Sequence, residues 1–202
     1  SKLADAIAKA KSVNMPNDNI KRCIAKAAGE LSGDNYEELT YEGYGPAGSA
    51  VIIKALTDNK NRTVDYVRTA MRKHGGSLGN TGCVSFTFSN LGVIVIERTP
   101  DLDEDVVMEY ALEAGADDIV NEDGIITVTT TPDAFAAVAD ALNAKGFESL
   151  SADVGMVPDA YTAVDAETAA KVQKLIDKLE DNDDVQNVYH TAEFPDDFNP
   201  EA

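Results

Sequence analysis

The residues best suited to chemistry lie between Arg62 and Gly79, where a cationic helical stretch runs into a glycine loop. Side chains of Asn59 to Thr63 can cap a helix that begins here. At helical spacing, one solvent-facing stripe of this helix consists of Arg62, Tyr66, Thr69 and Lys73. Two further cations, Arg68 and Arg72, lie one turn apart beside this stripe. Cations, a hydroxyl and an aromatic ring on one surface suit phosphate contact with stacking on a base or sugar. The alternative is a solvated helix face with an ion pair from Asp65 to Arg68 or Arg72.

The loop from His74 to Gly79 ends this helix, and its backbone N–H groups could converge on an anion. At the helix C-terminus, a cationic His74 is favoured by the helix dipole. No nucleophile or carboxylate stands at catalytic spacing from His74, and nothing in the sequence pairs it with His190 as a metal ligand. We therefore count His74 with the phosphate-facing residues and not as an acid or base.

Other motifs resemble known binding sites, but the residues around them argue against such a function. Gly43, Gly45 and Gly48 match the dinucleotide fingerprint, but a β-branched run follows them where a helix is needed, so we expect a hairpin turn. The acidic runs lack the spacing of a calcium loop. Cys23 and Cys83 stand among apolar neighbours and are expected to be small core residues. We expect no catalytic residue, no metal site and no cofactor, and a chain that is not an enzyme.

Charge is distributed very unevenly along the chain. Residues 91–202 carry 27 acidic and 5 basic side chains, whereas residues 31–90 carry six of each. Residues 1–30 have three acids against six cations, which are Lys2, Lys9, Lys11, Lys21, Arg22 and Lys26. A polyanion must therefore meet the first half, because the second half repels nucleic acid and is left to face solvent or a basic protein.

Hydrophobic periodicity places these residues on a series of elements. Two short helices over 2–12 and 16–28 precede a hairpin that starts at Glu37, the helix from 64 to 74, and a strand over 83–89. Strand, helix, strand, strand, helix and strand follow over 93–97, 102–114, 118–120, 125–130, 134–144 and 150–157. This βαββαβ order is that of a ferredoxin-like unit. A helix over 166–179 and a strand over 185–194 complete the chain.

The order of elements predicts an α+β protein made of α/β sandwich modules. A lone helix and strand cannot fold alone, so we expect 31–90 and 162–202 to join as one discontinuous α/β domain. An inserted ferredoxin-like domain covers 91–161, and a helical domain covers 1–30. No run of about 18 apolar residues and no leader sequence is found, so we expect a cytoplasmic, monomeric protein without membrane contact.

Six ordered motifs give the chain a resemblance to a known family. They are NMPNDNI (14–20), YEGYGPAG (41–48), LTDNKNRT (56–63), HGGSLG (74–79), LEAGADDI (112–119) and LEDNDDVQNVYH (179–190). Together they resemble the YebC/PmpR family, whose relatives include the mitochondrial translational activator of cytochrome oxidase. The resemblance implies the three-domain outline above. Members carry a basic helical segment ahead of the position equivalent to Ser1, and this sequence lacks it.

The resemblance implies a regulator of gene expression that binds nucleic acid, DNA or ribosomal RNA. The first expectation is a DNA-binding transcriptional regulator of this type. The alternative is a ribosome-associated translation factor that relieves stalling on proline-rich segments, with the acidic half meeting the ribosome or basic proteins. A metabolite-sensing module is a weaker alternative, with the loop between Ala114 and Asp118 as its site.

Overall fold

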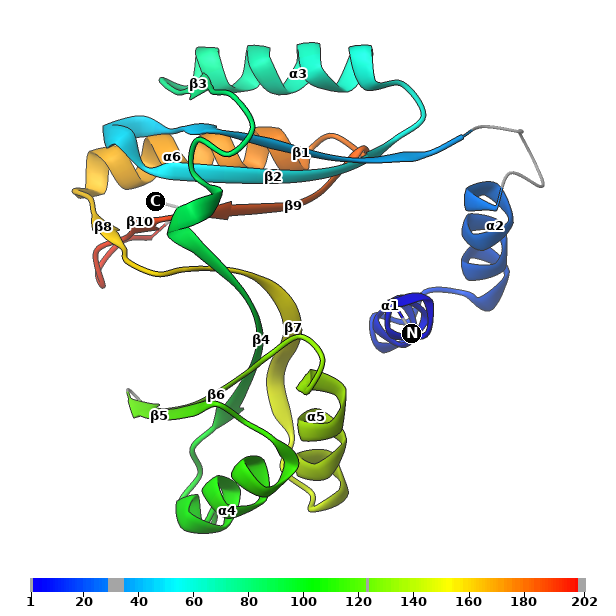
Figure 1. The fold of residues 1–202 in the computed structure, drawn as a ribbon, viewed down its shortest axis with the longest axis vertical. Coiled ribbons are helices and arrows are strands. Elements are labelled where there is room, and N and C mark those ends of the chain that lie inside the picture. The colour runs from blue at the N-terminus through cyan, green and yellow to red at the C-terminus, as the bar shows by residue number, and fades with distance from the viewer. Residues whose placement is uncertain (1, 29–34, 123, 200–202) are drawn as a thin grey trace.

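The computed structural model describes residues 2–28, 35–122 and 124–199, apart from the side chains of Lys2, Asp5 and Ser12. Two helices, α1 (Lys2–Ser12) and α2 (Asn17–Ala27), stand beside the rest of the molecule (Figure 1). Ile20 of α2 is buried, whereas Leu3, Val13 and Met15 are exposed. Cys23 is exposed as well, so its expected place in a core is wrong.

A four-stranded antiparallel sheet forms the centre of the molecule, in the order β3-β1-β2-β9. Its strands are β1 (Glu37–Tyr44), β2 (Ala50–Thr57), β3 (Ser77–Leu78) and β9 (Val185–His190). The helices α3 (Lys60–Lys73) and α6 (Ala166–Glu180) pack on one face of it. The sheet therefore joins segments that lie more than a hundred residues apart.

Strand β2 is buried on both sides, which explains its continuous apolar run. Val51 and Ile53 pack against Met71 of α3 and Leu175 of α6. Ile52 packs with Val84 and Phe88 in a second apolar cluster on the opposite face of the sheet. Nearly every side chain of β2 is therefore buried. A one-turn 3₁₀ helix, η1 (Pro46–Gly48), closes the β1–β2 hairpin, with Gly48 at a φ of +74°. The glycine motif is thus a hairpin turn, as its context predicts.

The second sheet has the ferredoxin-like order β5-β6-β4-β7, again antiparallel. It consists of β4 (Phe88–Glu97), β5 (Asp118–Glu122), β6 (Ile125–Thr130) and β7 (Ser149–Pro158). Helices α4 (Glu104–Ala114) and α5 (Phe135–Ala144) bury their apolar sides against it. Short parallel strands β8 (Thr162–Ala163) and β10 (Ala192–Glu193) pair near the end of the chain. The α+β class with a ferredoxin-like βαββαβ unit is confirmed.

One expected strand is wrong. Residues 83–87 form a loop with a short 3₁₀ turn, η2 (Ser85–Thr87), and the strand β4 begins only at Phe88. The backbone N–H groups of Gly82, Val84 and Ser85 donate to the carboxylate of Glu42 at 2.8–3.0 Å, so a side chain takes the place of a strand partner. Within the described ranges, no helix is long and apolar enough to cross a membrane.

Candidate nucleic-acid interface

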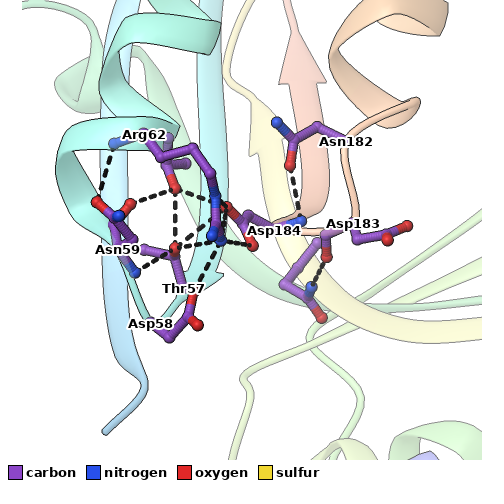
Figure 2. A network of polar contacts seen from close by, with 9 residues as sticks. Thr57, Asp58, Asn59, Arg62, Asn182, Asp183 and Asp184 are labelled. Carbon is purple, nitrogen blue, oxygen red and sulfur yellow. Dashed lines mark hydrogen bonds and ion pairs between the residues drawn. The ribbon is translucent and has the colours of Figure 1, made fainter. Parts of the chain in front are cut away.

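Arg62, at the start of α3, is engaged in a network of polar contacts (Figure 2). Its Nη2 lies 2.8 Å from Asp184 Oδ2 and 2.8 Å from Asp58 Oδ1. Asn59 caps the helix by accepting a hydrogen bond from the Arg62 N–H at 3.1 Å, as the sequence predicts. The Arg62 charge is thus balanced by two carboxylates that compete with a phosphate, and its place in a phosphate-binding stripe stays a prediction.

Asp184 is the hub of this network and is only 9% exposed. Its Oδ2 also accepts hydrogen bonds from Thr63 Oγ1 at 2.8 Å and Thr57 Oγ1 at 3.1 Å. Burial by itself would raise the pKa of Asp184, but the hydrogen bonds from Arg62, Thr63 and Thr57 outweigh it and hold the pKa below its ordinary value. The network ties the end of β2 and the first turn of α3 to the segment before β9.

Tyr66 also contacts residues of its own chain. Its hydroxyl donates to the Lys178 carbonyl oxygen at 2.6 Å, and Lys178 Nζ lies 5.6 Å from its ring centroid. Tyr66 is therefore half-buried against α6, and its expected stacking on a base or sugar stays a prediction. In the first two turns of α3, Arg62 thus contacts the segment before β9 and Tyr66 contacts α6.

Arg68, Arg72 and Lys73 occupy the exposed side of the second half of α3. Arg68 Nη1 lies 3.3 Å from Asp65 Oδ1, an exposed ion pair of the kind that contributes little. Arg72 and Lys73 have no ion-pair partner among the residues that the structure describes. We call Arg68, Arg72 and Lys73 the α3 cationic surface. His74 follows as the C-cap, and its N–H donates to the Ala70 carbonyl oxygen at 3.2 Å.

The glycine loop does not offer its N–H groups to an external anion. Gly76 N donates to Met71 O at 2.8 Å, and Gly79 N donates to Glu42 O at 2.9 Å. The nest of N–H groups that does exist lies at 82–85 and is filled by Glu42, which is 4% exposed. Burial opposes ionisation of Glu42, but the N–H donors prevail and lower its pKa. The expected anion loop is therefore wrong.

The cations of the first two helices are spread out. Lys9 Nζ lies 3.6 Å from Asp153 Oδ2, with both side chains exposed. Lys26 lines a cavity of about 620 Å³ together with Arg62, Asp58, Asp181, Asp183 and Asp184, so it faces carboxylates. Lys11, Lys21 and Arg22 are exposed on α1 and α2. The side chain of Lys2 lies outside the described part of the structure.

The sequence alone does not predict the environments of two polar side chains, Asp184 and His190. Asp184 sits within the run EDNDDV, where nothing distinguishes it from its exposed neighbours. His190 stacks on Phe194 at a centroid distance of 5.5 Å, and its buried Nδ1 has no hydrogen-bond partner among the described residues. Burial lowers the pKa of His190 below its ordinary value.

The sequence of this chain is similar to those of known proteins. Residues 36–192 match the family described as "TACO1/YebC second and third domain". A probable transcriptional regulatory protein of Hathewaya histolytica is 58% identical over 96% of this chain and 79% of its own length. Another of the same description, from Clostridium tetani, is 56% identical over 98% of this chain and 80% of its own.

A solved structure shares the fold. The crystal structure of a conserved hypothetical protein from Aquifex aeolicus superposes with a TM-score of 0.80 at 41% identity. The match covers 95% of this chain and 79% of that protein. The resemblance seen in the six motifs therefore extends to the three-dimensional arrangement.

Proposed function

Because the chain belongs to the TACO1/YebC family, we propose that it is a non-enzymatic regulator of gene expression that binds nucleic acid through the α3 cationic surface. The two relatives compared above are named probable transcriptional regulatory proteins, which supports the regulatory class. A DNA-binding transcriptional regulator is the first candidate.

The observation that carries this proposal is the contrast between the two ends of α3. Carboxylates neutralise Arg62 at the N-terminal end, whereas Arg72 and Lys73 at the C-terminal end project into solvent. The negative end of the helix dipole also lies near these cations and stabilises their positive charges. Unpaired cations release counterions from a nucleic acid when they meet its phosphates, and that release drives binding.

The surface fits the phosphate backbone better than base edges. Helix α3 lies on the sheet through Val67, Ala70 and Met71, so it presents its side to a ligand. From Val67 to Lys73 it carries no Asn or Gln to read adenine, and the side chains best suited to base contact there are Arg68 and Arg72, which can pair with guanine. We therefore expect modest sequence preference and strong salt dependence. This profile favours ribosomal RNA as a second target, in which case the protein is a ribosome-associated translation factor.

The double substitution Arg72→Ala/Lys73→Ala tests the proposal. On duplex DNA the plot of log K against log salt should become shallower by up to about 1.8, because each lost phosphate contact removes about 0.9. A matched control is Lys171→Ala/Lys174→Ala, which removes two exposed cations of α6. The control should leave the slope unchanged.

The same titration on structured RNA and on ribosomes separates the two targets. Preferential binding to DNA supports the transcriptional function, and co-sedimentation with ribosomes at physiological salt supports the translational one. A slope near zero for the unaltered protein on both nucleic acids would overturn the proposal.

A further inference from the structure

Helix α4 exposes an apolar and acidic face that nothing within the described residues covers. Val107 and Ala111 are fully buried against the sheet, while Met108 and Leu112, one turn apart, are 43% and 51% exposed. Exposed carboxylates flank them at the same helical spacing, namely Asp105, Glu109 and Glu113. We call these five residues the α4 face. Isolated exposed apolar residues are normal, but two in register on one helix form a stripe.

Contacts around α4 show which way this stripe points. Lys145 Nζ lies 4.2 Å from the centroid of the Tyr110 ring, so the Tyr110 side of the helix faces the end of α5. On the other side, Glu104 is paired with Arg98 and accepts a hydrogen bond from Asn121 of β5. Met108 and Leu112 follow Glu104 by one and two turns, and thus lie on the side of α4 toward β5. Strand β5 is the edge of its sheet and has only β6 as a neighbour in it.

The charge around this face is almost entirely negative. Residues 91–161 contain sixteen Asp or Glu and two Lys or Arg. Both cations are engaged locally, Arg98 with Glu104 and Lys145 over Tyr110. Among the described residues, Asp105, Glu109 and Glu113 have no ion-pair partner. The face therefore combines an apolar anchor with uncompensated negative charge.

We infer that the α4 face docks a cationic amphipathic helix of a partner protein. Leucine-like side chains of such a helix would cover Met108 and Leu112, and its Lys or Arg residues would pair with Asp105, Glu109 and Glu113. Methionine adapts its shape to different apolar partners, which suits a docking surface. Nucleic acid is repelled here by the same carboxylates. The inference goes beyond the proposed function and uses different residues, so either can fail without the other.

The four methionines of the chain give a direct probe of this contact. The full chain is labelled with ¹³C at the methionine methyl groups and titrated at physiological salt with an 18-residue helical peptide of Leu and Lys at amphipathic spacing. The Met108 signal should shift and saturate, while that of Met71, which lies on α3 and is fully buried against the central sheet, stays in place. A peptide of the same composition in scrambled order should bind at least about tenfold more weakly, because it cannot present one apolar side.

Two variants identify the two parts of the face. Met108→Asn/Leu112→Asn should weaken peptide binding at least about tenfold, as expected for removal of a central apolar anchor. Leu150→Asn, at another exposed apolar position in the same unit, should leave binding unchanged. Glu109→Gln/Glu113→Gln should weaken binding and reduce its salt dependence.

Several results would overturn the inference. Binding of the peptide without a shift at Met108 would show attraction by the overall negative charge alone. A Met108 shift that grows with protein concentration in the absence of peptide would identify a second copy of the chain as the occupant. A shift on addition of RNA or DNA would contradict the choice of a cationic protein partner.

Discussion

Asp184 shows how a single carboxylate can decide the role of a cation far away in the chain. It accepts from Arg62, Thr63 and Thr57, three side chains more than 120 residues earlier in the sequence. Removal of the Asp184 carboxylate is costly because it leaves the buried hydroxyl groups of Thr57 and Thr63 without this acceptor. Asp184 therefore stabilises the junction of β2, α3 and β9 and pairs with Arg62 there.

Asp184→Asn should lower the free energy of unfolding by about 2–3 kcal/mol, the contribution of hydrogen bonds to a charged group. Urea unfolding at neutral pH measures this effect. Asp181→Asn is the matched control, because Asp181 is exposed and makes a surface ion pair with Lys178. Its effect should stay within about 0.5 kcal/mol. Equal effects of the two substitutions would contradict a special role for Asp184.

The lowered pKa of Asp184 gives this contribution a defined pH dependence. A carboxylate with a folded-state pKa below 3.8, its ordinary value, binds fewer protons in the folded state than in the unfolded one. Its stabilising effect is thus present above pH 3.8 and is lost as the pH falls through the folded-state value. Acid unfolding of Asp184→Asn should show a shallower loss of stability below pH 4 than the unaltered protein. An unchanged slope would rule out this titration.

At the scale of elements, the Glu42 side chain holds the loop between β3 and β4 against β1. Three N–H groups of this loop converge on one carboxylate that is almost completely buried. The loop thereby carries Val84 and Phe88 onto the face of the central sheet opposite α3 and α6. The carboxylate acts as an internal partner for backbone groups that no strand satisfies.

Glu42→Gln should loosen this loop while leaving both sheets intact. The amide keeps one acceptor oxygen but places an NH₂ group against backbone donors, which should cost about 1–3 kcal/mol. Amide hydrogen exchange at Gly82, Val84 and Ser85 should accelerate, with little change in α4 or α5. Glu38→Gln, an exposed position of the same strand, is the control and should alter neither stability nor exchange.

Periodicity was enough to predict most of the elements, and long-range contacts account for the errors. The hairpin, the α3 helix and the βαββαβ order follow from local patterns of apolar residues, because those patterns mark buried faces. The alternating run 83–89 fails as a strand because its N–H groups bond to Glu42, forty residues away. The contacts of Arg62 with Asp184 and of Tyr66 with Lys178 could not be predicted, because they join distant parts of the chain. The exposure of Arg72 and Lys73 could be predicted, because the apolar residues of an amphipathic helix determine which side of it faces solvent.

At the scale of the whole molecule, the dominant property is a net charge of −19. Like charges on a folded surface repel one another, and salt screens this repulsion over about 8–10 Å at physiological ionic strength. Nucleic acid and cationic protein are consequently expected on different surfaces, the first at α3 and the second at α4.

Raising NaCl from about 10 mM to about 150 mM should increase the melting temperature, because self-repulsion outweighs the few attractive surface pairs. Differential scanning calorimetry measures the shift. A variant with Glu109→Gln and Glu113→Gln removes two acids from the α4 face and should melt higher at low salt, with a smaller response to NaCl. A melting temperature that falls with added salt would mean that attractive pairs dominate.

The central sheet is closed by β9, which pairs with β2 after more than a hundred intervening residues. During synthesis, the unit from β4 to β7 can thus acquire its shape while the earlier hairpin still waits for α6 and β9 to leave the ribosome. Leu175, Leu179 and Val185 reach the core last. A nascent chain halted between β7 and α6 would leave the apolar side of β2 and α3 without its cover, and transiently exposed apolar surface of this kind favours aggregation.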